Sequence, residues 1–252
     1  MQAKRIKVAV IGYQGRMGQV TIDALDKHPK LMLGAKIGRQ ELQAEEECVA
    51  SLKECKAFID FSHADAQLTI YTFLQKHSIY LPMITGVTGL SAKVQSVINL
   101  YAQQAPVLQA ANFSIGIALL KRLSRLSAQS LDQGFDTEIF ELHHRHKQDS
   151  PSGTAYALAE AIVEGKQTIG QQAQINTDAV NYLRKDSEIH ISAGRGGGVF
   201  GDHSVFFLSE HERIELKHSA LNRSVFADGA LRAAQWCLKQ SPGLYQMDDL
   251  WA

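Results

Sequence analysis

The first 110 residues alternate between short apolar runs and amphipathic stretches with helical spacing. Each apolar run has the length and composition of a buried strand. It is followed by a turn and then by a segment whose apolar residues recur with the helical period of about 3.6 residues. Strands that alternate with helices predict a doubly wound parallel sheet, a Rossmann-like α/β domain that binds ligands at the carboxyl ends of its strands. The predicted strands are residues 5–11, 31–37, 57–61, 79–85 and 106–110.

The pattern changes at Ile115. A long amphipathic helix is predicted to follow, and then an alternating strand over 135–144. Three later strand-like segments have no helices between them, so we expect a second α+β domain with a mixed sheet that is open on one face. Such a face often packs on another subunit. The later segments are residues 188–197, 203–210 and 213–220, and a final amphipathic helix begins near residue 224.

A glycine-rich turn, VAVIGYQGRMG, joins the first strand to the first helix and contains Gly12, Gly15 and Gly18. Backbone N–H groups in such a turn, together with the N-terminus of the helix, face the pyrophosphate of a dinucleotide. The spacing is GxxGxxG rather than the usual GxGxxG, so a plain strand–helix turn is the alternative to nucleotide binding.

The end of the second strand bears on the choice of cofactor. In NAD-binding proteins an acidic residue here usually holds the ribose hydroxyls. This chain has Gly38 and then Arg39, which could meet a 2′-phosphate with help from Arg16. The pattern favours NADP over NAD, and a solvated loop arginine is the competing interpretation. Loops at 86–89 and 110–114 follow the fourth and fifth strands and are further candidates for the ligand crevice.

The composition restricts the cellular setting and the partners. Among 252 residues, 26 Lys and Arg balance 26 Asp and Glu, which argues against a general nucleic-acid or anionic-membrane surface. Three cysteines without a CxxC pair favour a reducing cytoplasm over a disulfide framework. The apolar run behind the basic N-terminus is too short for a signal peptide, and no window approaches the roughly 18 apolar residues of a membrane span. We expect a cytoplasmic protein.

The densest chemistry lies in ELHHRHKQDSPSGTA, residues 141–155. On a strand, His143 and His144 would point to opposite faces, and one of them would share a face with His146. Histidine suits proton transfer because its unperturbed pKa is about 6.5. Lys147 offers a positive charge, or a general acid if it is buried.

The SPSGT segment predicts a helix start, with proline in the first turn. Gly153 and Thr154 would then present backbone N–H groups at a helix N-terminus, which is a natural site for a carboxylate. Together with Lys147 this would suit a small anionic substrate. Two other interpretations stay open. One is a polar strand end with a capped helix. The other is zinc held by His144 and His146 together with His190, His203 or Glu141, although no fixed-spacing metal motif occurs.

At these residues the chain resembles the 4-hydroxy-tetrahydrodipicolinate reductase family, also called dihydrodipicolinate reductase. The family signature E-x-H-H-x-x-K-x-D-x-P-S-G-T-A is matched at every defined position of Glu141–Ala155. The similarity runs through nearly the whole chain. It also covers GRMG at 15–18, GxTG at 86–89, AANFS at 110–114, GxH at 201–203, and Arg223 with FADGA at 226–230.

The resemblance implies a reaction and an assembly. A hydride passes from NADPH or NADH to the cyclic imine of 4-hydroxy-tetrahydrodipicolinate (dihydrodipicolinate), a proton is added at the neighbouring carbon, and tetrahydrodipicolinate forms on the diaminopimelate route to lysine. It implies a dinucleotide domain, 1–114, completed by the C-terminal segment 224–252. The substrate domain, 115–223, carries the mixed sheet that builds a homotetramer.

The resemblance also implies roles for individual residues. His143 is the proton donor or acceptor, and Lys147 the proton donor. His144, Gly153 and Thr154 bind the substrate carboxylates. The residues expected at the cofactor, with Arg39 added from the strand-end argument above, are Gly12, Tyr13, Gln14, Gly15, Arg16, Met17, Arg39, Gly86, Val87, Thr88, Ala110, Ala111, Asn112 and Phe113. No metal is expected.

Two departures from the family pattern affect the cofactor. Gly38 stands where members that use NADH often carry an acid, and Val87 stands where threonine is common. We therefore expect NADPH to be preferred, with NADH as a second cofactor. The alternatives are another two-domain NADP oxidoreductase, of the aspartate-semialdehyde or homoserine type, and a nucleotide-binding sensor without chemistry. An aspartate-semialdehyde type needs a catalytic cysteine, and none of the three cysteines lies near a plausible site.

Overall fold

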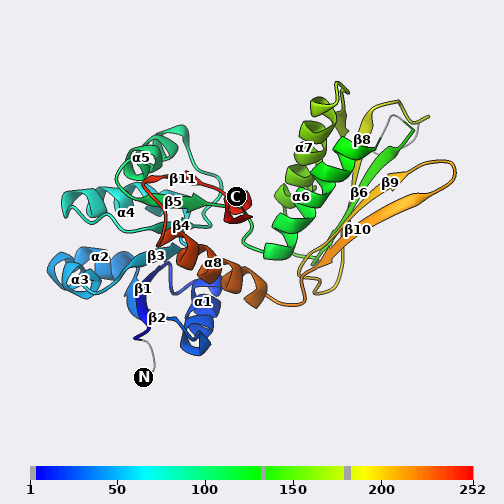
Figure 1. Cartoon of the computed structure of the whole chain (residues 1–252). Coiled ribbons are helices and arrows are strands. Elements are labelled where there is room, and N and C mark those ends of the chain that lie inside the picture. The colour runs from blue at the N-terminus through cyan, green and yellow to red at the C-terminus, as the bar shows by residue number, and fades with distance from the viewer. Residues whose placement is uncertain (1–3, 132–133, 179–182, 252) are drawn as a thin grey trace. The chain divides into compact units, whose positions relative to one another are not determined.

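The structure is a computed structural model that describes residues 4–131, 134–178 and 183–251. It divides into two compact units, Met1–Ser114 with Arg223–Ala252 and Ile115–Asn222 (Figure 1). No helix among the described residues has the length and apolar character needed to cross a membrane. The cysteines Cys48, Cys55 and Cys237 are buried and unpaired.

The first unit is built on a six-stranded sheet in which every neighbouring pair is parallel. Its order is β11-β5-β4-β3-β1-β2. The strands are β1 (Ile6–Ile11), β2 (Leu31–Ile37), β3 (Ala57–Asp60), β4 (Met83–Thr85), β5 (Pro106–Gln109) and β11 (Gly243–Tyr245). The three-residue β11 is too short for its sequence to show a strand pattern, and only its pairing with β5 makes it part of the sheet.

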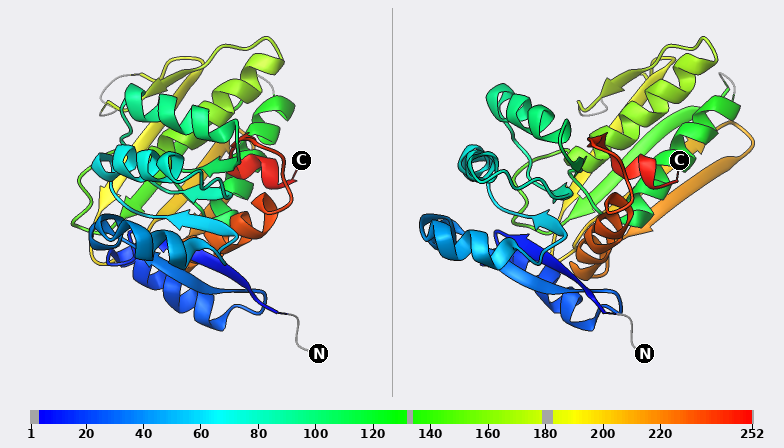
Figure 2. Two further views of the ribbon diagram at one scale, coloured as in Figure 1. Left: turned by 90° about the vertical axis from the view of Figure 1, so that its left-hand side faces the viewer. Right: turned by 60° about the vertical axis from the view of Figure 1, so that its left-hand side comes forward.

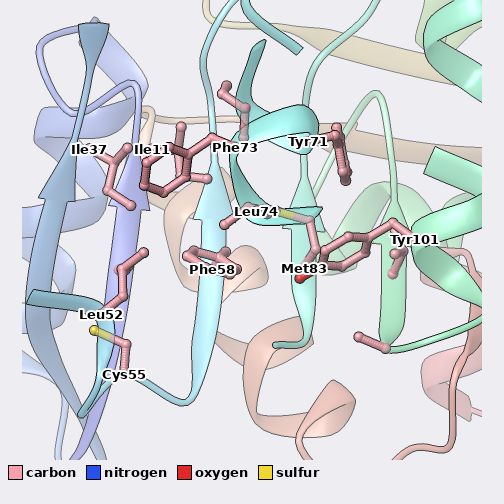
Figure 3. Close-up of a cluster of buried hydrophobic side chains, with 14 of the residues drawn as sticks. Ile11, Ile37, Leu52, Cys55, Phe58, Tyr71, Phe73, Leu74, Met83 and Tyr101 are labelled. Carbon is pink, nitrogen blue, oxygen red and sulfur yellow. The ribbon is translucent and has the colours of Figure 1, made fainter. Parts of the chain in front are cut away.

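Helices cover both faces of this sheet (Figures 1 and 2). They are α1 (Arg16–Lys27), α2 (Arg39–Gln43), α3 (Glu45–Leu52), α4 (Ala64–Lys76), α5 (Ala92–Ala102) and α8 (Ser224–Cys237), and the short 3₁₀ helix η1 (Met247–Trp251) follows β11. Alternate residues of β1 point to opposite faces. Ala9 and Ile11 pack with Phe58, Tyr71 and residues of α3 and α5 in the cluster of Figure 3.

The second unit is a mixed five-stranded sheet of order β10-β9-β6-β8-β7. β6 is parallel to β8 and antiparallel to β9, and β10 is antiparallel to β9. Its elements are α6 (Ile115–Ser130), β6 (Asp136–His143), α7 (Gly153–Thr168), β7 (Gln174–Asn176), β8 (Glu188–Arg195), β9 (Asp202–Leu208) and β10 (Arg213–Ser219). The helices α6 and α7 lie side by side on one face of the sheet (Figure 1).

The alternation along β6 separates a covered face from an open one. Thr137, Ile139, Glu141 and His143 are buried, and Ile139 belongs to the core beneath α6 and α7. Phe140, on the opposite face, is 45% exposed. The predicted fold class, a parallel dinucleotide-type sheet plus a second mixed-sheet unit, is confirmed. Among the described residues of this unit, no helix covers the second face (Figure 1).

Candidate active site

The end of β6 carries two buried polar residues on the helix-covered face. Glu141 and His143 are two positions apart, so their side chains point to the same side of the sheet. The Glu141 side chain is completely buried, and that of His143 is 11% exposed. An acid and a histidine in a core position need polar partners, because an unpaired buried charge is costly.

Those partners are present and converge on Glu141. One carboxylate oxygen, Oε2, contacts Nδ1 of His143 and also accepts a hydrogen bond of 2.9 Å from Arg195. The other, Oε1, accepts from Arg195 at 2.8 Å and from the backbone N–H of Ser152 at 3.1 Å. Arg195 thus binds the carboxylate with two nitrogens, which fixes both position and orientation.

This network determines the charge of Glu141 and the tautomer of His143. Burial by itself raises the pKa of Glu141, but hydrogen bonds from His143 and Arg195 outweigh it and hold the pKa at about 2. An ionised carboxylate only accepts hydrogen bonds, so Nδ1 of His143 must donate its proton to Glu141. In the neutral ring Nε2 then carries no proton and can accept one.

A second histidine lies edge-on to His143. The ring of His203 is 5.1 Å from that of His143, and its Nε2 is 3.2 Å from the hydroxyl oxygen of Ser152. Burial, and then the neighbouring His143, lower the pKa of His203 to about 3. His203 is therefore neutral near pH 7 and does not repel a positive charge on His143.

Gly201 leaves space for the His143 ring. Its backbone has φ of +152°, a region that favours glycine. A Cβ atom at this position would lie 2.9 Å from Nε2 of His143. Any side chain here would therefore crowd Nε2 of His143.

Lys147 follows β6 in a turn and is held by Asp149. Its ammonium group lies 2.8 Å from both carboxylate oxygens of Asp149. The strand ends at His143, so the expectation of strand alternation through His144 and His146 is wrong beyond this point. The turn instead places the rings of His144 and His146 6.3 Å apart.

The N-terminus of α7 lies beside Glu141. Ser152 caps the helix by accepting a 3.2 Å hydrogen bond from the N–H of Ala155, and the helix begins at Gly153. Pro151 therefore precedes the cap rather than standing in the first turn as expected. A Cβ atom at Gly153 would meet nothing within 4 Å, so space remains next to this helix end, where Thr154 is the second residue. The positive end of the helix favours an anion there.

Among the residues that the structure describes, no group of three or more His, Cys, Asp or Glu side chains is placed to hold a metal ion. Glu141, one of the further ligands considered for zinc, instead binds His143 and Arg195. His190 binds Glu138 on the opposite face of β6, at 3.1 Å.

The glycine turn belongs to a pocket of about 800 Å³ in the first unit. The pocket is lined by the predicted cofactor residues Gly12, Tyr13, Gln14, Gly15 and Arg39, together with the loop after β3. Gly12 has φ of +74°, and a Cβ atom there would lie 2.7 Å from the backbone of Ser62. Glycine is therefore required by the contact between the two loops, and not only by the approach of a ligand.

The residues of this pocket fit a dinucleotide. The glycine turn leads into a helix that starts at Arg16, no acidic residue occurs in the first turn of α1, and Arg39 follows the end of β2. Arg16 and Met17 begin α1 and are not among the lining residues.

The strands β4 and β5 are parallel, so the loops that follow them begin at the same edge of the sheet. These loops contain the remaining predicted cofactor residues, Gly86–Thr88 and Ala110–Phe113, none of which lines the pocket. Phe61 and Phe113 stack edge-to-face at 5.7 Å, and a Cβ atom at Gly86 would lie 2.5 Å from the Phe61 ring. The two loops therefore adjoin the loop that lines the pocket.

Several residues of these sites were missed by sequence reasoning. Ser62 and His63 line the pocket and directly follow the predicted strand 57–61, so the strand-end rule that selected the other loops would have selected them as well. Glu141, two positions before His143, was considered only as a metal ligand. Arg195 has no local signal, because its contact with Glu141 spans 54 residues.

Comparisons with known proteins identify the family. Residues 6–113 match the family described as "Dihydrodipicolinate reductase, N-terminus", and residues 116–251 match "Dihydrodipicolinate reductase, C-terminus". The chain belongs to the dihydrodipicolinate reductase family. The resemblance on which the sequence prediction rested is therefore confirmed.

Named relatives agree over almost their full length. The chain is 37% identical to the 4-hydroxy-tetrahydrodipicolinate reductase of Wolinella succinogenes, over 96% of this chain and 98% of the relative. It is 39% identical to that of Zymomonas mobilis, over 97% and 96% respectively. The dipicolinate-bound dihydrodipicolinate reductase of Paenisporosarcina sp. TG-14 has a similar structure, with a TM-score of 0.75, 22% identity, and coverage of 96% of this chain and 98% of that one.

Proposed function

We propose that the chain catalyses the reduction of 4-hydroxy-tetrahydrodipicolinate to tetrahydrodipicolinate with a pyridine nucleotide, in the diaminopimelate route to lysine. One observation carries this proposal: a histidine bound to a buried, ionised glutamate lies beside the open N-terminus of α7. That arrangement supplies proton exchange and anion binding within one unit. The reduced nicotinamide, when bound, supplies the hydride.

The chain's own residues have separate roles in this proposal. Glu141 and Arg195 hold His143 so that Nε2 gives or takes the proton at the ring carbon next to the reduced position. Gly153 and Thr154, at the start of α7, bind one substrate carboxylate, and His144 contributes to carboxylate binding. Lys147 exchanges its pairing with Asp149 for the substrate and acts as the proton donor.

The test is oxidation of NADPH by the purified chain, with freshly made product of dihydrodipicolinate synthase as substrate. Turnover is expected only with substrate and cofactor together. The His143→Ala variant should lower kcat by roughly 10²–10⁴, as for the loss of a proton-transfer group. Absence of turnover above background in the wild type would overturn the proposal. Full biological function of His143→Ala would favour the non-catalytic sensor.

We further propose NADPH as the preferred cofactor and NADH as the second. The support is Arg39, which lines the pocket at the end of β2 and offers a guanidinium for bidentate binding of a 2′-phosphate. Replacement of Arg39 by alanine should lower kcat/KM for NADPH by about tenfold more than for NADH. A factor of about ten corresponds to the free energy of one hydrogen bond to a charged group. A wild type that uses NADH at least as well would contradict this preference.

The oligomeric state and the compartment are proposed on separate grounds. The open face of the second sheet carries exposed Phe140 beside half-buried Phe206 and Leu142, an apolar surface that supports a homotetramer built through this sheet. The three unpaired buried cysteines support placement in the reducing cytoplasm.

A further inference from the structure

The end of β2 is the part of the nucleotide pocket where the choice between NADP and NAD is expected to be made. Gly38 and Arg39 line the pocket together with the glycine turn after β1, and β1 and β2 are neighbours in the sheet (Figure 1). A side chain at the end of this strand ordinarily meets the adenosine ribose of a dinucleotide. Gly38 has no side chain, so the position itself supplies neither an acid nor a base.

The carboxylate of Glu41 lies where a side chain at position 38 would stand. A Cβ atom at Gly38 would lie 3.0 Å from Oε2 of Glu41 and 3.3 Å from the ring of Tyr13. By standard bond lengths, a glutamate at position 38 would carry its own carboxylate oxygens at about the same 3 Å from its Cβ. The first turn of α2 thus brings a carboxylate to the tip of β2 from three residues further along the chain.

The carboxylate of Glu41 is held by a neutral group. Its Oε1 accepts a 3.0 Å hydrogen bond from the hydroxyl of Tyr13, and that hydroxyl accepts one of 3.3 Å from the side-chain amide of Gln14. The other oxygen, Oε2, is buried and has no hydrogen-bond partner among the described residues. The ammonium group of Lys36 lies 5.8 Å from the centroid of the Tyr13 ring.

The charge of Glu41 is therefore not neutralised by an ion pair with any described residue. Tyr13 and Gln14 both line the pocket, so the uncompensated charge lies directly behind its wall. Oε2 of this carboxylate is buried and Glu41 as a whole is half-buried, and water and salt screen a partly buried charge less than an exposed one. A 2′-phosphate carries close to two negative charges at neutral pH, whereas a ribose diol carries none.

We propose that Glu41 is a second specificity-determining residue, which opposes the 2′-phosphate that Arg39 attracts. The inference rests on the proposed nucleotide site. Its consequence is that Glu41 weakens the binding of a 2′-phosphorylated nucleotide relative to one with a free ribose diol, because the carboxylate and the phosphate have charges of the same sign. Tyr13 is the positioning residue that holds the carboxylate there.

Binding to the full-length protein without substrate tests this apart from catalysis. The probes are adenosine 2′,5′-bisphosphate and adenosine 5′-phosphate, whose Kd values are measured by isothermal titration calorimetry. Glu41→Gln keeps the acceptor for Tyr13 but removes the charge, and it should bind the 2′-phosphorylated probe roughly fivefold to tenfold more tightly, with little change for the other. Glu41→Asp keeps the charge and should retain the wild-type ratio of the two Kd values.

Glu46→Gln is the matched control, because it removes an exposed acid from the adjacent helix α3. It should leave both Kd values unchanged. Equal changes of both Kd values in Glu41→Gln would mean a structural role and would overturn the inference, as would no change in either. If the wild type binds neither probe, the nucleotide site itself is refuted. If the ratio of the two Kd values shifts as much in Glu46→Gln as in Glu41→Gln, only the net charge of the protein matters, and the inference is overturned.

Discussion

Replacement of Glu141 by glutamine tests the pair at the centre of the site. The change keeps the size of the side chain and removes the charge that binds His143 and Arg195. An amide nitrogen can donate to Nδ1 of His143, which would move the ring proton to Nε2. In the neutral ring, the nitrogen that we propose for proton exchange would then already carry a proton and could no longer accept one.

The size of the effect follows from the contacts. A hydrogen bond to a charged group contributes about 1.5–3 kcal/mol, and about 1.36 kcal/mol corresponds to a tenfold change in rate, so kcat should fall roughly 10- to 150-fold. Stability should fall as well. The Glu141 side chain is 0% and that of Arg195 19% exposed, and removal of one partner from a buried ion pair costs about 3–5 kcal/mol.

Glu138→Gln is a control for the loss of stability. Glu138 lies on the same strand but on its other face, where it binds Arg184 and His190 much as Glu141 binds Arg195 and His143. Both variants should lose stability in denaturant unfolding, with light scattering to check assembly. Only Glu141→Gln should lose kcat, at a temperature where both variants are folded.

The tautomer of His143 is a readout that does not depend on turnover. Nitrogen chemical shifts of its labelled imidazole should show the proton on Nδ1 in the wild type and in Glu138→Gln, and on Nε2 in Glu141→Gln. The reasoning is refuted if folded Glu141→Gln keeps the wild-type kcat, or if its ring keeps the Nδ1–H tautomer while kcat falls.

Three further predictions follow from the same structure. Gly201→Ala places a Cβ atom 2.9 Å from Nε2 of His143 and should lower kcat by at least about tenfold. The Kd for adenosine 5′-phosphate should stay unchanged. An unchanged kcat would contradict the packing argument. The pKa of Glu141 is about 2 in the folded protein and about 4.3 in the unfolded chain. Its ionisation therefore contributes about 3 kcal/mol to the free energy of unfolding, which is fully present above about pH 5 and is lost as the pH falls through 2. The free energy of unfolding of the wild type should thus fall more steeply between these pH values than that of Glu141→Gln, and parallel curves would contradict the assignment. Phe140→Asp, on the open sheet face, should dissociate the proposed tetramer in light scattering, and an unchanged mass would place the interface elsewhere.

Much of the first unit and the location of the chemistry could be read from the sequence. Strand and helix periodicity report which side chains are buried, and this is a local property of the chain. The stretch Glu141–Ala155 was recognisable because no core requires so many titratable groups together. The strand-end rule likewise located Arg39 and the glycine turn, which the structure brings to one pocket.

The tertiary structure decided the contacts that give these residues their properties. The parallel register of β6 and β8 places Arg195 opposite His143, and so provides the guanidinium that keeps Glu141 ionised. Strand β11 exists only through its pairing with β5. The hydroxyl of Tyr13, 28 residues earlier in the chain, holds the carboxylate of Glu41 beside Gly38. Such contacts depend on register and on the direction of side chains between distant segments, which local periodicity does not encode.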